Sequence, residues 1–422
     1  MKTKQNSEHI LVYADWDGME SPVLMGVLKV AHSKGKELFS FEYEEKWLED
    51  RTRFQIDPEL QLYSGLQYPG DEKRNFGIFL DSCPDRWGRI LMQRREAALA
   101  KLEQRPKQHL YERDYLLGVY DQQRLGALRF KKEKDSEFLS NEKMMAAPPW
   151  AALRELEEIS LRLEEEEAQD NPEYLNWLSM LIAPGSSLGG ARPKASIIDP
   201  DEHLWIAKFP GKNDHFNVGA WEYVVYCLAI NAGINMSESQ ARKFTTRHHT
   251  FLTKRFDRTA TGTRLHFASA LTLLGYSDGV NSSDGVSYLE LAEFISENGA
   301  NVDADLHQLF RRIVFNIFVS NTDDHLRNHG FILSNSGWNL SPAYDINPNP
   351  FGRGLTLNIT ETSNELDLDL VMEIYPFFRL KEVDAKRIIH EVKSRILDWK
   401  KIAKEVGILR GEVEEMRGVF EK

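Results

Sequence analysis

The sequence predicts an α+β fold, with an N-terminal mixed α/β domain followed by a two-lobed core whose C-terminal lobe is mainly helical. Two observations support this class. Short runs near the N-terminus read as strands, one of them alternating apolar and polar residues. Later in the chain, residues 306–318 and 383–402 show the three- and four-residue apolar spacing of helices. We expect three domains, formed by residues 1–149, 150–260 and 261–422.

The first domain is expected to begin with three strands. Residues 9–14 and 23–30 are apolar runs joined by a turn at Asp17-Gly18. Residues 38–43 alternate apolar and polar side chains, as a half-buried strand does. The sequence therefore predicts a small sheet at the start of the chain.

A helix is expected within residues 78–92. Asp81 or Ser82 could be its N-terminal cap, because both side chains can accept hydrogen bonds from exposed backbone amides. Pro84 would then lie near the first turn, where a helix tolerates proline.

A linker and an acidic stretch follow. Residues 131–149 have the composition of a linker. Leu153 and Leu156 then begin an apolar pattern that predicts an exposed amphipathic helix. We interpret the four glutamates at 164–167 as a solvated face and not as a binding site.

Composition restricts the class of protein. The chain has 422 residues, a net charge of -12 and two cysteines, Cys83 and Cys227, both in apolar surroundings. We therefore expect two buried thiols, which are typical of a cytoplasmic protein without a disulfide framework. No apolar run is long enough to span a bilayer, and no secretory signal core precedes the first strand. The acidic charge argues against non-specific binding of nucleic acid by the chain as a whole.

A glycine- and serine-rich loop at residues 183–195 could face an anion with its backbone amides. It lacks the Walker A pattern, and such a loop alone is more often only a loop. The strand expected at 203–209 carries Lys208 near its end, where a kinase has its phosphate-binding lysine. We predict an ion pair between Lys208 and Glu222 of the next helix; the alternative is a lysine whose amine simply reaches solvent.

The densest group of polar residues is the octet 321–328, which directly follows the helix predicted at 306–318. Asp323 and Asn328 stand five positions apart, as the catalytic Asp and the metal-binding Asn do in protein kinases. Asp345 follows one short hairpin later. The octet alone could be a solvated turn, but Asp345 favours a metal–nucleotide site.

Taken in order, these motifs resemble the HipA family, the serine/threonine kinase toxins of bacterial type II toxin–antitoxin systems. The resemblance covers the glycine-rich loop, the strand lysine, a lobe connector at 250–258, the octet, and Ser-Pro-Ala-Tyr-Asp at 341–345. Residues 79–89, Phe-Leu-Asp-Ser-Cys-Pro-Asp-Arg-Trp-Gly-Arg, extend it to the first domain. The resemblance implies that the two-lobed core is protein-kinase-like and uses ATP and Mg²⁺.

The resemblance also implies roles for single residues. Asp323 is implied as the catalytic base, with the adjacent Asp324 as its rival. Asn328 and Asp345 are implied as Mg²⁺ ligands beside the nucleotide, and Ser187 as the site of autophosphorylation. The other residues implied at the nucleotide are Gly189, Gly190, Ala191, Arg192, Pro193, Lys194 and Lys208 at the phosphates, and Lys254, Arg255, Phe256, His325 and Tyr344 around its remainder.

Finally, the resemblance implies partners. Family members inhibit translation by phosphorylating an aminoacyl-tRNA synthetase, and a small helix-turn-helix antitoxin (HipB-like) neutralises them, so that DNA is met only through the antitoxin. Three other interpretations stay open: a kinase-fold co-repressor that mainly binds an antitoxin on DNA, a kinase for a lipid or small-molecule hydroxyl, and a metal hydrolase at Asp323-Asp324-His325. A hydrolase would need further ligands on neighbouring helices.

Overall fold

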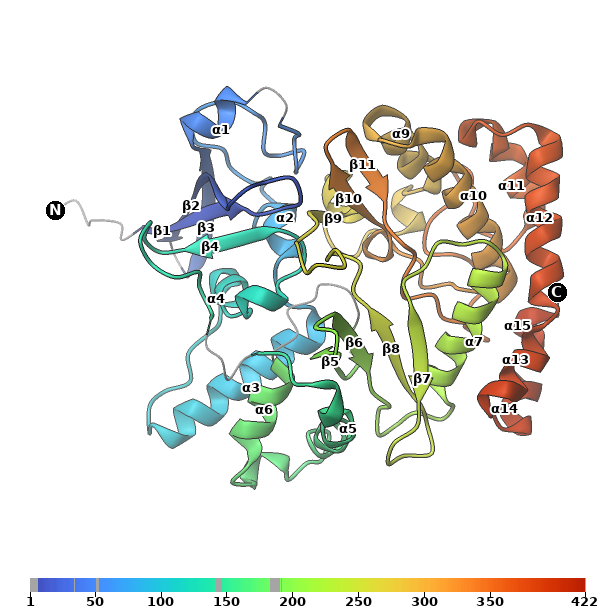
Figure 1. Ribbon diagram of the computed structural model, residues 1–422, viewed down its shortest axis with the longest axis horizontal. Helices are drawn as coiled ribbons and strands as arrows, with labels where there is room; N and C mark the ends of the chain where they lie inside the picture. Colours follow the sequence, from blue (N-terminus) through green and yellow to red (C-terminus); the bar gives the residue numbers. More distant parts are fainter. Residues whose placement is uncertain are drawn as a thin grey trace. The chain divides into compact units, whose positions relative to one another are not determined.

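The computed structural model describes residues 7–33, 35–50, 53–141, 146–182, 190 and 192–421. Figure 1 shows its helices and strands. The chain divides by its packing into two compact units: unit 1 comprises Met1–Ala207 and Asp257–Ser277, and unit 2 comprises Lys208–Phe256 and Asp278–Lys422. Antiparallel strands and helices occur in both units, which confirms the α+β class. The three domains expected from the sequence stay a prediction.

Unit 1 contains an antiparallel sheet with the strand order β3-β2-β1-β4 (Figure 1). Ile10, Val12 and Ala14 of β1 are fully buried and alternate with less buried neighbours, because successive side chains of a strand point to opposite faces. This sheet confirms the three strands expected near the N-terminus. Its strands are β1 (Glu8–Ala14), β2 (Val23–Ser33), β3 (Lys36–Tyr43) and β4 (Leu128–Lys131).

The single helix expected within residues 78–92 is two helices, α2 (Gly77–Asp81) and α3 (Arg86–Leu102). The expected cap was wrong. Asp85 is the N-cap of α3, and its Oδ1 accepts a hydrogen bond from the Gly88 amide at 2.8 Å.

Asp81 and Ser82, the two expected caps, have other partners. Asp81 is buried at the end of α2 and accepts hydrogen bonds from the amide (2.7 Å) and the hydroxyl (2.8 Å) of Ser269. Burial raises the pKa of Asp81 to about 6. The Ser82 hydroxyl donates to the Ile78 carbonyl at 3.3 Å. Both side chains therefore stabilise the interior of unit 1 and do not cap a helix.

The amphipathic helix predicted after the linker is confirmed as α5 (Leu153–Arg162). Leu153, Leu156 and Ile159 are buried along one face. Residues 165–167 of the acidic run are exposed, as a solvated face requires. The remaining elements of unit 1 are α1 (Glu45–Glu49), α4 (Glu112–Leu117), α6 (Tyr174–Ile182), β5 (Lys194–Ile198), β6 (Leu204–Lys208, its last residue belonging to unit 2), β9 (Phe267–Ser269) and α8 (Ala270–Leu273).

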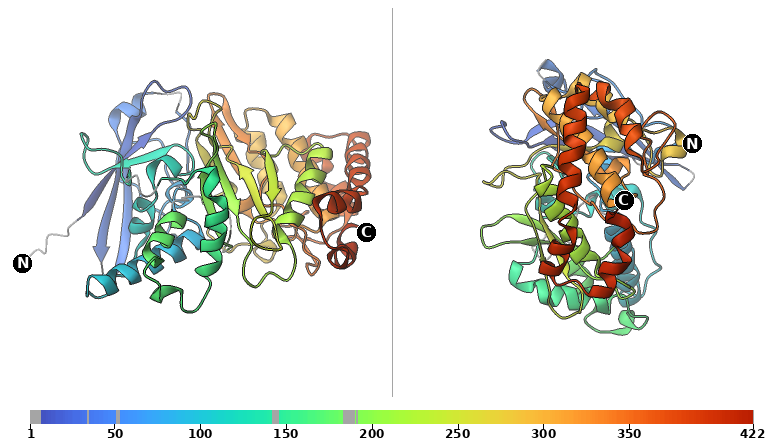
Figure 2. Two further views of the ribbon diagram at one scale, coloured as in Figure 1. Left: turned by 60° about the horizontal axis from the view of Figure 1, so that its bottom comes forward. Right: turned by 90° about the vertical axis from the view of Figure 1, so that its right-hand side faces the viewer.

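Unit 2 is built around the helix predicted at 306–318, which is α10 (Val302–Val319). Its apolar stripe from Leu306 to Val319 is buried, and α10 packs against α9 (Tyr288–Asn298) and α12 (Glu382–Ile396; red in Figure 2). The other elements of unit 2 are α7 (Val218–Asn231), the antiparallel pair β7 (Ser239–Arg242) and β8 (Thr250–Lys254), the antiparallel pair β10 (Gly330–Ser334) and β11 (Gly337–Leu340), α11 (Leu368–Ile374), α14 (Arg410–Glu415) and α15 (Arg417–Phe420).

The prediction of a single late helix at 383–402 was wrong. The chain turns after α12, and α13 (Trp399–Val406) is a separate helix. Leu397 is exposed at this turn, whereas Trp399 is buried, with its ring 4.9 Å from the ring of Phe420. The turn brings the Trp399 ring into the interior, and large aromatic side chains gain much from burial.

Among the described residues, no helix combines the length and apolar character needed to cross a bilayer. Both cysteines are free thiols. Cys83 is buried as expected, but Cys227 is only partly buried, so the expectation of two buried thiols holds for one of them.

Candidate active site

The polar octet lies in unit 2, directly after α10. Ser320 ends this helix in the left-handed conformation (φ 51°), and its amide donates back to the Ile317 carbonyl at 3.3 Å. The chain then makes a tight loop and a short 3₁₀ helix, η6 (Leu326–Asn328). The two adjacent aspartates of the loop have opposite surroundings: Asp323 is exposed and Asp324 is buried.

Asp324 is held inside unit 2 by hydrogen bonds to one of its oxygens. Its Oδ2 accepts from the Tyr288 hydroxyl at 2.6 Å and from Asn316 Nδ2 at 2.7 Å, and His329 Nε2 lies 2.9 Å away. Burial alone would raise the pKa of Asp324, but His329 and the hydrogen-bond donors outweigh it and lower that pKa. Asp324 is therefore a buried carboxylate that fixes the shape of the loop.

Asp323 carries its carboxylate on the outside of the same loop. Partial loss of surrounding water raises its pKa, and the nearby Asp345 acts in the same direction, against His325. The side chain of Asn328 donates from Nδ2 to the backbone oxygen of Asp323 at 2.8 Å. This bond connects the two ends of the five-residue spacing seen in the sequence. The backbone of Asp323 is thus held in place and its carboxylate is accessible, as a group that accepts a proton from a bound molecule must be.

The hairpin β10–β11 returns the chain to Asp345. This residue has φ 57°, in the left-handed region that residues other than glycine seldom adopt. Asn321 lies between the two loops, because its Oδ1 accepts from the amide of Asn347 at 3.3 Å and its Nδ2 donates to Asn316 Oδ1 at 3.1 Å. The segments that carry Asp323 and Asp345 are therefore hydrogen-bonded to each other through Asn321.

Lys208, the first residue of unit 2, lies between two carboxylates. Its Nζ is 2.6 Å from Glu222 Oε1 and 2.5 Å from Asp345 Oδ1. The predicted ion pair with Glu222 is confirmed, and the sequence did not reveal the second partner. Burial alone would lower the pKa of Lys208, but Asp345 and Glu222 outweigh it and raise that pKa, so the amine stays charged.

The expected phosphate loop is described only in part. Ser187, Gly189 and Ala191 lie outside the described residues. Gly190 is exposed, Arg192 is partly buried and Pro193 is buried.

Lys194, expected at the phosphates, is buried within unit 1. Its Nζ lies 2.6 Å from Asp85 Oδ2 and donates to the Gly190 carbonyl at 2.8 Å. Lys194 thus connects the end of the loop to Asp85, the cap of α3. This contact gives a structural reason for Asp85 in the motif at 79–89, to which the sequence alone assigned no role.

The residues expected around the remainder of the nucleotide are only partly brought together. The rings of Phe256 and Tyr344 lie 5.5 Å apart, and the Tyr344 hydroxyl donates to the Arg327 carbonyl at 2.8 Å. Arg255 is buried, whereas Lys254 at the end of β8 is partly exposed. Phe256 and Tyr344 thus form one aromatic pair beside the loop of Asp345.

The donor groups suit a magnesium ion. Asp345 and Asn328 offer carboxylate and amide oxygens, which are the ligands that Mg²⁺ prefers, and sulfur or imidazole ligands are not part of the set. The hydrolase interpretation gains no support, because Asp324 is committed to the interior. Among the described residues, the group of metal-binding side chains close enough to share an ion is Asp199, Asp201 and His203, in a turn of unit 1.

Sequence reasoning gave no individual role to several residues that shape the site. Asn316 lies on the buried side of α10, and Asn321 and His329 flank the aspartates. An amide inside an apolar helical stripe is a usable signal, because buried polar groups need partners. Tyr288 gave no such signal, since a tyrosine in α9 is ordinary for a helix that packs on a core.

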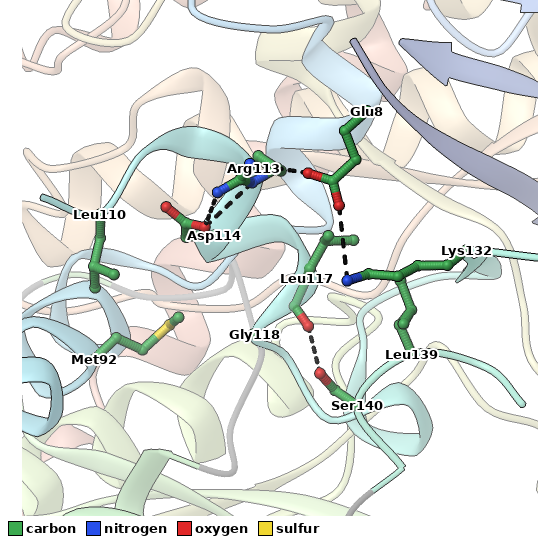
Figure 3. A pocket seen from close by; sticks show the side chains of 10 residues that line it. All are labelled: Glu8, Met92, Leu110, Arg113, Asp114, Leu117, Gly118, Lys132, Leu139 and Ser140. Atoms are coloured by element: carbon green, nitrogen blue, oxygen red, sulfur yellow. Dashed lines mark hydrogen bonds and ion pairs between the residues drawn. The ribbon is translucent and has the colours of Figure 1, made fainter. Parts of the chain in front are cut away.

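A pocket of about 590 Å³ with both polar and apolar lining lies in unit 1 (Figure 3). Its charges compensate each other: Arg113 contacts Glu8 at 2.9 Å and Asp114 at 2.7 Å, and Lys132 lies 3.8 Å from Glu8. None of its residues belongs to the expected site. The lining residues are Glu8, Met92, Leu110, Arg113, Asp114, Leu117, Gly118, Lys132, Leu139 and Ser140.

Two comparisons with known sequences bear on this site. Residues 186–400 match the HipA-like C-terminal domain family. Over 182 residues the chain is 28% identical to a putative kinase of Haemophilus influenzae. The matched region covers 38% of this chain and 52% of that protein. The chain thus spans about half the length of the curated relative it matches.

The fold is similar to that of a solved structure. A chain of the toxin–antitoxin complex of HipA, HipB and operator DNA from Shewanella oneidensis MR-1 matches with a TM-score of 0.67 and 16% identity, covering 98% of this chain and 96% of that chain. At this identity the likeness shows a shared fold. The proinflammatory kinase CtkA of Helicobacter pylori matches more weakly, with a TM-score of 0.36 and 18% identity, over 56% of this chain and 91% of its own.

Proposed function

The chain belongs to the HipA family, whose C-terminal domain matches residues 186–400, and on that premise we propose that it is an ATP- and Mg²⁺-dependent serine/threonine-protein kinase. The observation that carries the proposal is the arrangement in unit 2 of an exposed Asp323 with the partly buried Lys208–Asp345 ion pair. An accessible base, a charged lysine and oxygen donors for a metal are the groups that phosphoryl transfer needs.

Each residue has a role in this proposal. Lys208 exchanges its contact with Asp345 for the α- and β-phosphates of ATP, while Glu222 keeps the amine in position. Asp345 and Asn328 would hold Mg²⁺, which when bound neutralises phosphate charge. Asp323 would accept the proton of the substrate hydroxyl as the hydroxyl oxygen bonds to the γ-phosphorus, while the bond from that phosphorus to the β–γ bridging oxygen breaks and ADP leaves. Because phosphoryl transfer needs little covalent help, these residues act mainly by positioning and by charge.

We further propose that the kinase is the toxin of a toxin–antitoxin pair. Its substrate would be a translation component such as an aminoacyl-tRNA synthetase, and a small HipB-like antitoxin would bind it. The structural neighbour from Shewanella is a complex of HipA with HipB and operator DNA, which supports such a partner.

The proposal predicts self-phosphorylation at Ser187. Phosphate carries about -1.5 to -2 charges at neutral pH, and beside the phosphates of ATP it would repel them, so modification is expected to switch the kinase off. Mass spectrometry of the purified chain after incubation with Mg-ATP is expected to find phosphate on Ser187, and none in an Asp323→Asn control.

Two results would count against this prediction. Phosphate on the adjacent Ser186 would move the acceptor by one residue. The switch would not be at Ser187 if a Ser187→Ala chain still became phosphorylated. The chain would also have to lose as much activity during prolonged incubation as the wild type does.

We expect the chain to bind DNA only through the antitoxin. The net charge of -12 opposes binding to the phosphate backbone by the chain alone. In gel shifts at near-physiological salt, the purified chain should not shift operator DNA, whereas the chain with a basic helix-turn-helix antitoxin should. Tight and sequence-specific binding by the chain alone would contradict this expectation.

A further inference from the structure

Phe351 is the most exposed large apolar side chain among the described residues, with 86% of its surface open to solvent. It lies in the loop that follows Asp345. A single exposed apolar residue is common and needs no explanation by itself. Phe351 differs from such residues because its loop is attached to the segment that carries Asp323.

The Phe351 loop is hydrogen-bonded to the segment that carries Asp323. Asn349 donates from its amide to the Ser320 carbonyl at 3.1 Å and from Nδ2 to Thr322 Oγ1 at 2.7 Å. The same side chain accepts from the amide of Phe351 at 3.0 Å. Asn349 therefore fixes the backbone of Phe351 against Thr322, the residue immediately before Asp323.

Gly352 brings the loop still closer to Thr322. A Cβ on Gly352 would lie 2.2 Å from Thr322 Oγ1 and 2.4 Å from its Cγ2, so only glycine permits this approach. On the other side, the Thr356 hydroxyl donates to the Thr322 carbonyl at 2.8 Å. Phe351 is thus presented to solvent by a loop that contacts both the side chain and the carbonyl of Thr322, the neighbour of Asp323.

We propose that Phe351 is a docking residue for the protein segment that carries the acceptor hydroxyl, and that it selects an apolar side chain close to the acceptor. The inference rests on the proposed kinase function. A hydroxyl within reach of Asp323 brings its flanking residues over Thr322, and an extended chain advances about 3.3 Å per residue, so a residue near the acceptor meets Phe351. Exposed aromatic side chains are frequent anchors of protein interfaces, whereas a small-molecule acceptor would have no segment to reach this ring.

The test uses a peptide library with a central serine or threonine and one fixed residue at each flanking position in turn, phosphorylated with Mg-ATP labelled in its γ-phosphate. The wild-type chain is expected to prefer Leu, Ile, Phe or Met over Asp or Gly at one flanking position, by roughly tenfold. Phe351→Ala should remove this preference at unchanged KM for ATP, and Phe351→Leu should retain most of it. Phe377→Ala is the matched control, because Phe377 is another exposed phenylalanine of unit 2 and lies outside the Phe351 loop.

The outcomes separate the docking proposal from the kinase proposal. Identical preferences in the wild type and Phe351→Ala would overturn the docking role, and so would a chain that phosphorylates itself but no library peptide. A wild-type chain that phosphorylates neither itself nor any peptide and does not bind Mg-ATP would instead contradict the proposed function on which the inference rests.

Discussion

Asp323→Asn is expected to lower the rate of phosphate transfer by roughly 10²- to 10⁴-fold, the usual contribution of a general base, while the chain still folds and binds Mg-ATP. The substitution removes the proton acceptor but keeps the shape of an exposed side chain. The Asn328 bond to the backbone oxygen of residue 323 does not involve the substituted group. Initial rates with γ-labelled Mg-ATP measure the loss, and thermal unfolding checks the fold.

Asp324→Asn is the matched control at the adjacent position. This chain is expected to keep phosphate transfer but to lose stability. Asp324 Oδ2 accepts from Tyr288 and Asn316 and lies beside His329, all of them buried. The amide keeps one acceptor oxygen but loses the negative charge that these three buried groups share, and it is expected to lower the free energy of unfolding by about 1–3 kcal/mol. Normal transfer by Asp323→Asn, with loss of transfer in a stable Asp324→Asn chain, would reverse the assignment of the base.

Lys208→Met is expected to weaken Mg-ATP binding by about tenfold or more and to abolish measurable transfer. The substitution removes the cation proposed to bind the phosphates, and it leaves the carboxylates of Glu222 and Asp345 without the ammonium group between them. Their mutual repulsion should also lower the melting temperature of the chain.

Calorimetric titration with Mg-ATP measures the loss of affinity, and Lys243→Met is the matched control. Lys243 is an exposed lysine in the connection between β7 and β8 of the same unit. The control is expected to bind Mg-ATP like the wild type. Unchanged affinity in Lys208→Met would exclude Lys208 from the nucleotide site.

Periodicity predicted the elements whose burial is one-sided. The alternation in residues 38–43 became β3, and the apolar stripe of residues 306–318 became α10. Periodicity failed where a single contact decides the local structure. Asp85 caps α3 and also contacts Lys194 with its carboxylate, and the chain turns before Trp399, whose ring packs on Phe420. Contacts between residues far apart in the sequence cannot be read from local spacing.

The candidate site was likewise predictable in its local pattern and not in its long-range contacts. The spacing of Asp323 and Asn328 and the pairing of Lys208 with Glu222 were readable, because both follow the pattern of protein kinases. Which of two adjacent aspartates turns inward was not, since that depends on partners contributed by α9 and α10. The left-handed backbone of Asp345 and its contact with Lys208 likewise needed the folded chain.

The central claim, that unit 2 holds a magnesium-dependent ATP site, is tested most directly by titrating the wild-type chain with ATP in a calorimeter, once with Mg²⁺ and once with a chelator. We predict saturable binding with Mg²⁺ and clearly weaker binding without it, because Asp345 and Asn328 are proposed to reach the phosphates through the metal. Absence of saturable binding in the presence of Mg²⁺, or binding that is equally tight in the chelator, would contradict the account.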